Sequence, residues 1–247
     1  MTKRERLDQL LVDRNLADSR EKAKALILAG QVMVNGQRAD KAGHAVALDS
    51  RISVNQPLPY VSRAGKKLEA ALDHFRIVVA GRVCIDVGSS TGGFTDCLLQ
   101  RGAARVYAID VGTSQLDWKL RNDPRVIVRE KTNARYLRPE DFPELMDLAV
   151  CDVSFISVTM ILPALPGLLQ KDGEIVILVK PQFELDRGLV GKGGIVRDSG
   201  SHELACRKVA AAAEALGYLS DIIPSPVLGA EGNQEFLLHA KHAIFQN

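Results

Sequence analysis

The chain has 247 residues, 46% hydrophobic and 25% charged, so it can bury one substantial core and a small accessory domain. No apolar run approaches the roughly 18 residues that cross a bilayer, and the start, MTKRERLDQLL, lacks the apolar part of a signal peptide. We therefore expect a cytoplasmic protein. The four cysteines include no CxxC pair, so we expect neither a metal site nor a disulfide framework.

The net charge of +2 is unevenly distributed along the chain. Residues 1–67 hold 13 Lys and Arg against 7 Asp and Glu, whereas the remainder holds 19 against 23. A basic module followed by a mildly acidic one favours a protein in which the first part binds a polyanion and the second part modifies it.

The first segment, residues 1–54, has the pattern of a small α+β domain. Residues 4–29 show the apolar spacing of two short amphipathic helices. In QVMVNGQRA, apolar residues alternate on either side of Asn35-Gly36, which is a strong hairpin turn. A further strand over residues 51–54 completes the domain.

The next segment, NQPLPYVS at residues 55–62, contains two prolines and little periodicity, so it is predicted to be a linker. A helix follows over residues 65–75, and strand and helix patterns then alternate, as in a parallel sheet covered on both faces. The predicted strands lie near 83–87, 105–110, 126–130, 148–151 and 174–179, with helices that include 157–169. A helix at 202–216 and two strands at 218–223 and 235–241 follow, the last one antiparallel.

This layout over residues 63–247 predicts an α/β domain of the class I, Rossmann-like methyltransferase type with a seven-stranded, mostly parallel sheet. Its most informative stretch is VCIDVGSSTGGFT at residues 83–95, where a strand feeds a helix through glycines. Glycine permits positive φ and close approach of a ligand to the backbone, and the N–H groups of the helix start face the pocket. A second strand ends in Asp110, where a carboxylate can hold ribose hydroxyls.

Two cofactors compete for this turn. A dinucleotide fingerprint reads GxGxxG, but here the spacing is GxxxGG, with Ser90 at the position of the second glycine. Asp86 precedes the turn, and a carboxylate is better tolerated beside the sulfonium and amino groups of S-adenosylmethionine than beside a diphosphate. We therefore favour S-adenosylmethionine over NAD.

Two resemblances carry these expectations further. The run RLDQLLV…SREKAKALILAGQVMVNG resembles the S4 RNA-binding domain. DVGSSTGGFTD, CDVSFIS, LVKPQFE, GKGGIVRD and GNQEF occur in the order seen in the TlyA (haemolysin A) family, which joins an S4 domain to an FtsJ-like ribose 2′-O-methyltransferase domain. The resemblance covers the whole chain and implies S-adenosylmethionine as cofactor, with ribosomal RNA or ribosomal subunits as partner and a cytidine ribose as target.

The same resemblance implies a catalytic tetrad of Lys67, Asp152, Lys180 and Glu235. Asp152 and Lys180 each follow a predicted parallel strand, at the edge where open α/β sheets bind ligands. Where the family shows SRG, two residues and KL, this chain reads SRAGKKL, so Lys66 is an alternative to Lys67. Positioning and proton control are the main tasks in methylating a hydroxyl, and Lys180 is predicted to take or relay its proton.

Two further sets of residues complete the predicted sites. The cofactor set is Asp86, Gly88, Ser89, Ser90, Thr91, Gly92, Gly93, Phe94, Asp110, Val111, Asn133 and Asp152. The RNA-binding set is Arg4, Arg6, Arg20, Lys22, Lys24, Arg38, Arg63 and Lys66.

Three other functions remain open on the sequence. One is a non-catalytic RNA-binding protein that keeps a methyltransferase-like fold, and another is an NAD-dependent oxidoreductase. The third is a membrane-lytic haemolysin, as the family's older name implies, although the sequence has no obvious lytic helix.

Overall fold

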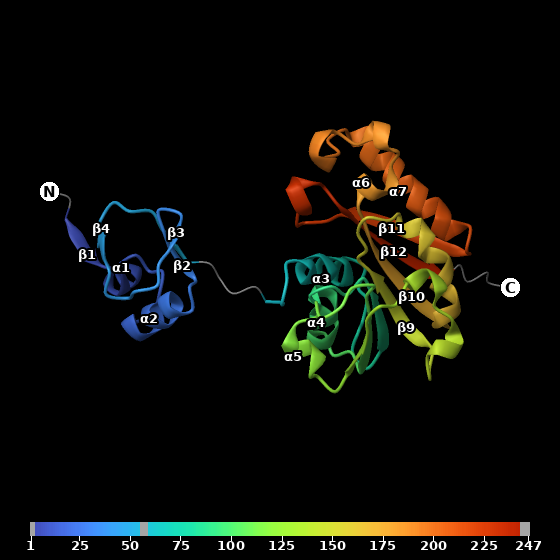
Figure 1. Ribbon diagram of the computed structural model, residues 1–247, viewed down its shortest axis with the longest axis horizontal. Coiled ribbons are helices and arrows are strands. Elements are labelled where there is room, and N and C mark those ends of the chain that lie inside the picture. Colours follow the sequence, from blue (N-terminus) through green and yellow to red (C-terminus); the bar gives the residue numbers. More distant parts are fainter. Residues whose placement is uncertain (1–2, 55–58, 243–247) are drawn as a thin grey trace. The chain divides into compact units, whose positions relative to one another are not determined.

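The computed structural model describes residues 3–54 and 59–242 and divides into two compact units, Met1–Leu58 and Pro59–Asn247 (Figure 1). Of the predicted linker, residues 55–58 lie outside the described residues. Residues 59–62 pack on the larger unit, where Tyr60 is buried and its hydroxyl donates a 2.7 Å hydrogen bond to Glu69.

The smaller unit contains two helices and two small antiparallel sheets. The helices are α1 (Leu7–Asp13) and α2 (Arg20–Leu28). One sheet pairs β1 (Arg4–Arg6) with β4 (Ala45–Ala47), and the other has the order β3 (Gln37–Arg38), β2 (Val32–Val34), β5 (Ile52–Val54). Leu7, Leu11 and Ile27 are fully buried between these elements.

The predicted helices, hairpin and last strand of this unit are confirmed. The prediction of helix from residue 4 was wrong, because Arg4–Arg6 forms a strand. Its partner, Ala45–Ala47, lies far along the chain, and only this long-range pairing makes the segment extended.

The larger unit is built on one sheet with the order β11-β12-β10-β9-β6-β7-β8. Its strands are β6 (Val83–Val87), β7 (Arg105–Ile109), β8 (Val126–Arg129), β9 (Met146–Cys151), β10 (Leu169–Val179), β11 (Tyr218–Pro224) and β12 (Phe236–His242). Neighbouring strands in the run β10-β9-β6-β7-β8 pair in parallel. Strand β12 runs antiparallel to both of its neighbours, β10 and β11. This confirms the predicted seven-stranded, mostly parallel sheet.

Helices cover both faces of the sheet. The α-helices are α3 (Ala64–His74), α4 (Gly93–Gln100), α5 (Trp118–Arg121), α6 (Pro181–Glu184) and α7 (Ser199–Glu214). Leu68, Leu72 and Leu98 of α3 and α4 pack on one face, where alternate strand residues such as Cys84 meet them. Helix α7 lies beside the β10–β12 part of the sheet (Figure 1). Its Val209 belongs to the hydrophobic cluster of the other face.

The prediction of one helix over residues 157–169 was wrong. The structure has three consecutive 3₁₀ segments instead, η3 (Val158–Met160), η4 (Leu162–Ala164) and η5 (Pro166–Leu168). Pro163 and Pro166 lack the N–H that a continuous helix would need at these positions. The apolar face is nevertheless buried, with Leu162 and Leu165 fully enclosed.

The sheet topology defines one edge at which ligand-binding loops converge. The loops after β6, β7, β8, β9 and β10 all leave the carboxyl ends of parallel strands. The antiparallel β12 begins at this same edge, because Phe236 pairs with Val179 at the end of β10.

Within residues 3–54 and 59–242, no helix is long and apolar enough to cross a membrane, and no cluster of His, Cys, Asp and Glu is suited to a metal ion.

Candidate active site

The glycine-rich turn after β6 passes close to the loop after β9. Gly88 has φ +84°, and a Cβ atom added there would lie 2.4 Å from the carbonyl oxygen of Asp152. Any larger residue would therefore push these two loops apart. A Cβ on Gly93 would lie 2.2 Å from Ser62 Oγ, so glycine also allows the start of α4 to approach the segment before α3.

The Asp110 carboxylate joins the turn after β6 to the loop after β7. It accepts a 2.8 Å hydrogen bond from the backbone N–H of Ser90 and a 2.7 Å bond from that of Gly112. Ser90 has φ +47°, a conformation uncommon for a residue with a side chain. Each carboxylate oxygen has a second lone pair, so Asp110 can accept further hydrogen bonds from a ligand.

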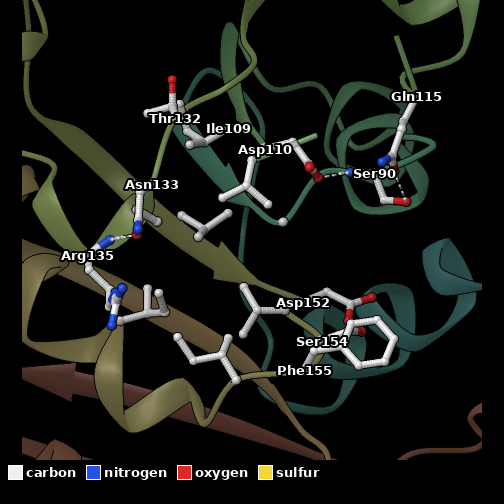
Figure 2. A pocket seen from close by; sticks show the side chains of 17 residues that line it. Ser90, Ile109, Asp110, Gln115, Thr132, Asn133, Arg135, Asp152, Ser154 and Phe155 are labelled. Atoms are coloured by element: carbon white, nitrogen blue, oxygen red, sulfur yellow. Dashed lines mark hydrogen bonds between the residues drawn. The ribbon is translucent and has the colours of Figure 1, made fainter. Parts of the chain in front are cut away.

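A cavity of about 470 Å³ lies at this edge, within the size range of small-molecule sites. Figure 2 shows Ser90, Asp110 and Gln115 grouped at one part of its wall and Asn133 with Arg135 at another. Six members of the predicted cofactor set line it: Gly88, Ser90, Asp110, Val111, Asn133 and Asp152. Apolar side chains including Ile109, Ile156 and Ile161 supply much of the remaining wall.

A smaller cavity of about 140 Å³ adjoins the first and shares part of its wall. The predicted residues that line it are Gly88, Ser89, Ser90, Thr91, Gly93, Phe94, Asp152 and Lys180. It is the more polar of the two and includes an ammonium, a carboxylate and several hydroxyls. An apolar chamber beside a polar one fits a cofactor with a nucleoside at one end and a charged amino acid at the other.

Asp86 and Gly92, both in the predicted cofactor set, line neither cavity. Asp86 is fully buried beneath the turn and accepts a 2.6 Å hydrogen bond from Thr95 Oγ1. Its Oδ1 has no hydrogen-bond partner among the described residues. Burial raises the pKa of Asp86 to about 7, helped by the nearby Asp152 carboxylate and opposed by the Thr95 hydrogen bond.

Several wall residues were not predicted from the sequence. They are Ser62, Gln115, Thr132, Arg135, Ser154 and Phe155, among others. Thr132 directly precedes the predicted Asn133, and Arg135 lies two residues after it; the side-chain oxygen of Asn133 accepts a 3.1 Å hydrogen bond from the Arg135 backbone N–H. The CDVSFIS motif contains Ser154 and Phe155 and was the available signal for them.

Two lysine–carboxylate pairs form among the four predicted tetrad residues. Lys180 Nζ lies 2.6 Å from Asp152 Oδ1 and donates a 2.8 Å hydrogen bond to Ser154 Oγ. The Lys180 and Asp152 side chains are only 11% and 17% exposed. They meet because β9 and β10 are parallel neighbours that end at the same edge.

The second pair is the ion pair between Lys67 on α3 and Glu235, which precedes β12. Both residues are buried, at 8% and 2% exposure. Continuing the β10–β12 register by one step sets Glu235 opposite Lys180, so this pair lies next to the first. Lys66, the alternative to Lys67, is exposed.

All eight predicted RNA-binding cations are exposed. Arg6 and Arg20 also have an internal role, since each lies 2.9 Å from the buried Asp8 carboxylate. The hydrogen bond from Arg6, with the Arg20 charge, holds the pKa of Asp8 well below its usual range despite burial. Arg38 lies against Gly30 at the end of α2, whereas Arg4, Lys22 and Lys24 extend from the smaller unit and Arg63 and Lys66 from the larger one.

Comparison with known proteins identifies both units. Residues 60–242 match the FtsJ-like methyltransferase family and residues 5–52 the S4 domain. The chain is 49% identical over 241 residues to the 16S/23S rRNA (cytidine-2′-O)-methyltransferase TlyA of Mycobacterium tuberculosis, covering 96% of this chain and 90% of that protein. It is 45% identical to Hemolysin A of Brachyspira hyodysenteriae, covering 95% of this chain and 98% of that protein.

A solved structure agrees with these matches. It belongs to a Streptococcus thermophilus protein named as a hemolysin, is 46% identical and covers 98% of this chain and 90% of its own, with a TM-score of 0.75. The two family models, the relatives that share nearly the full length and the common fold lead to one assignment. This chain belongs to the TlyA family, in which an S4 domain precedes an FtsJ-like methyltransferase domain.

Proposed function

We propose that this protein transfers a methyl group from S-adenosylmethionine to a ribose 2′-hydroxyl of ribosomal RNA, with a cytidine as the target. The observation that carries this proposal is the Lys180–Asp152 pair at the wall of the polar cavity, with the buried Lys67–Glu235 pair next to it. The relatives named as cytidine-2′-O-methyltransferases support the same reaction.

The residues around the two cavities fit the cofactor. Asp110 presents lone pairs suited to ribose hydroxyls, and Asn133 presents an amide to the apolar chamber, where the adenine would lie. Ser89, Ser90 and Thr91 offer donors to a carboxylate in the polar chamber. When bound, S-adenosylmethionine supplies an activated methyl group on a sulfonium.

The chain's own task is to position the hydroxyl and to remove its proton. Methyl transfer forms a carbon–oxygen bond, breaks the carbon–sulfur bond and leaves the hydroxyl proton to be taken up. Lys180 faces the polar chamber and, as an ammonium paired with Asp152, relays that proton: one of its own N–H protons passes to the Asp152 carboxylate as the hydroxyl proton moves to Nζ. Asp152 and Ser154 fix its Nζ atom, while Glu235 holds Lys67 as a second positive charge nearby.

The smaller unit serves to bind RNA in this proposal. Its exposed cations Arg4, Lys22, Lys24 and Arg38 would contact phosphates, and the ribosomal subunit or its RNA is the partner. We propose the division 1–54 for RNA binding and 63–247 for methyl transfer, joined by residues 55–62, of which residues 59–62 pack on the larger unit. A cytoplasmic location follows from a ribosomal substrate and stays a prediction.

The test maps ribose methylation across ribosomal RNA from cells with and without the gene, and repeats the transfer with purified protein and labelled S-adenosylmethionine. We expect one or a few cytidine 2′-O-methyl groups to depend on the gene, and Lys180→Met to abolish them while the protein stays folded. Protein that binds RNA and transfers no methyl group would instead support the non-catalytic RNA-binding function.

A further inference from the structure

We propose that Glu184 is a positioning residue that sets Lys180 against Asp152, an inference that rests on the proposed function. Glu184 ends α6, the single helical turn that begins directly after Lys180. Its side chain is buried and faces the segment after β9 that carries Asp152. None of the roles assigned so far uses this carboxylate.

Both oxygens of the Glu184 carboxylate bind the segment after β9. Oε1 accepts a 2.7 Å hydrogen bond from the Val158 N–H, and Oε2 accepts a 2.5 Å bond from Ser157 Oγ. Lys208 on α7 donates a 2.5 Å hydrogen bond to the Glu184 carbonyl, and its Nζ lies 3.9 Å from Oε2. Each oxygen of the carboxylate therefore accepts a hydrogen bond from the segment after β9, and Lys208 partly balances its charge.

The two segments meet at three successive points. At one end Lys180 binds Asp152 and Ser154. In the middle, the rings of Phe155 and Phe183 lie 5.4 Å apart. At the other end Glu184 binds Ser157 and Val158, so segment 180–184 is fastened to segment 152–158 along its whole length.

The loop around Phe155, in the middle of this contact, depends on the contacts at both of its ends to keep its conformation. Phe155 has φ +65° and is 92% exposed, so its backbone is in an unfavourable conformation that its own burial does not offset. Ser154, Phe155 and Ile156 also line the larger cavity. The Lys180–Asp152 pair holds one side of this loop and Glu184 holds the other.

Losing the Glu184 contacts should free one end of α6 and let Lys180 shift relative to Asp152. A misplacement of about 1 Å at a reacting group costs about 100-fold in rate. Glutamine at this position keeps the volume but offers only one acceptor oxygen to two donors. Glu184→Gln is therefore the informative variant, and Glu203→Gln, at an exposed residue of α7 paired with Arg207, is its matched control.

The experiment measures RNA methyl transfer, S-adenosylmethionine binding and the chemical reactivity of Lys180. For Glu184→Gln we expect kcat to fall about 10- to 100-fold while the KM for RNA changes little. Since residues 154–156 line the larger cavity, we expect the cofactor Kd to rise by a smaller factor than kcat falls. We also expect reductive methylation of Lys180, read by mass spectrometry against the exposed Lys66, to become several-fold faster. Ser157→Ala should move the same readouts in the same direction and add little to Glu184→Gln, whereas Glu203→Gln should leave them unchanged.

Two outcomes would overturn the proposal. One is a Glu184→Gln variant with unchanged kcat and unchanged Lys180 reactivity. The other is a general loss of thermal stability and cofactor binding with the Lys180-to-Lys66 ratio unchanged, which would make Glu184 merely structural. Because Lys180 reactivity is measured without methyl transfer, it tests the positioning role even if the wild type methylates no RNA.

Discussion

Lys180 and Asp152 follow different strands, and the Nζ atom of Lys180 lies 2.6 Å from Asp152 Oδ1. The parallel pairing of β9 with β10 brings their carboxyl ends together and produces this contact. Both side chains line the polar cavity. The proposed proton relay, Lys180, therefore lies in direct contact with Asp152, the carboxylate that orients it.

Asp152→Asn tests the charge of this pair. The amide keeps the side-chain volume but can neither hold the Lys180 ammonium by charge nor take up the proton that Lys180 relays, so we expect methyl transfer to fall about 100-fold or more. The measurement is single-turnover transfer of labelled methyl groups to ribosomal RNA. Asp172→Asn serves as control, because Asp172 is an exposed residue near the start of β10, the strand whose other end precedes Lys180. Transfer at the wild-type rate by Asp152→Asn would contradict the assignment.

Lys67→Met tests the buried ion pair through stability. Removing the ammonium leaves the Glu235 carboxylate buried and unpaired, which should lower the free energy of unfolding by about 3–5 kcal/mol. The control is Lys66→Met at the exposed neighbouring residue, which should change the free energy of unfolding by no more than about 0.5 kcal/mol. Urea denaturation of both variants measures the difference.

The double variant Lys67→Met/Glu235→Leu removes both charges and should regain much of the lost stability. If Lys66→Met were the more destabilising of the two single changes, the pairing of Lys67 with Glu235 would be wrong.

Asp110→Asn tests the link between the two cofactor loops. Both carboxylate oxygens accept backbone N–H groups, so the amide of asparagine must turn its own N–H toward either Ser90 or Gly112. Losing such a hydrogen bond to a charged group costs about 1.5–3 kcal/mol, so the Kd for S-adenosylmethionine should rise by about 10- to 100-fold. Calorimetric titration measures the Kd, with Asp221→Asn on β11 as control. An unchanged Kd would show that Asp110 does not shape the cofactor site.

Asp86→Asn tests the buried carboxyl beneath the turn through pH. Its pKa rises from 3.8 to about 7 in the folded protein, so the native state keeps a proton that the unfolded chain releases. Proton retention by Asp86 therefore contributes to the free energy of unfolding below about pH 4, and this contribution is lost as the pH rises to about 7. Asparagine does not ionise in this range and can still accept the Thr95 hydrogen bond.

The stability of Asp86→Asn relative to the wild type should therefore increase between about pH 4 and pH 7, by up to roughly 4 kcal/mol. Urea denaturation of the cofactor-free proteins at about pH 4 and pH 8 measures this change. Equal stability differences at both pH values would show that Asp86 titrates normally.

The sequence by itself determined the parts of this protein that depend on local patterns. Strand and helix patterns that alternate along the chain predicted the parallel sheet, and Asn35-Gly36 predicted the hairpin of the smaller unit. Glycine spacing predicted the tight turn at Gly88, which has positive φ. The hydrogen bond from the Ser90 N–H to Asp110, which joins this turn to the next loop, was not predicted. The family motifs predicted four tetrad positions, and their catalytic roles stay predictions.

Only the tertiary structure decided how distant residues pair. It joins Lys67 rather than Lys66 to Glu235, ties Arg6 and Arg20 to Asp8, and buries Asp86 away from both cavities. Hydropathy patterns show which face of a helix is buried but not which charged side chain will find a partner there. That choice depends on the crossing of elements far apart in the chain, because burying a charged side chain is costly unless an opposite charge or hydrogen-bond donors are brought to meet it.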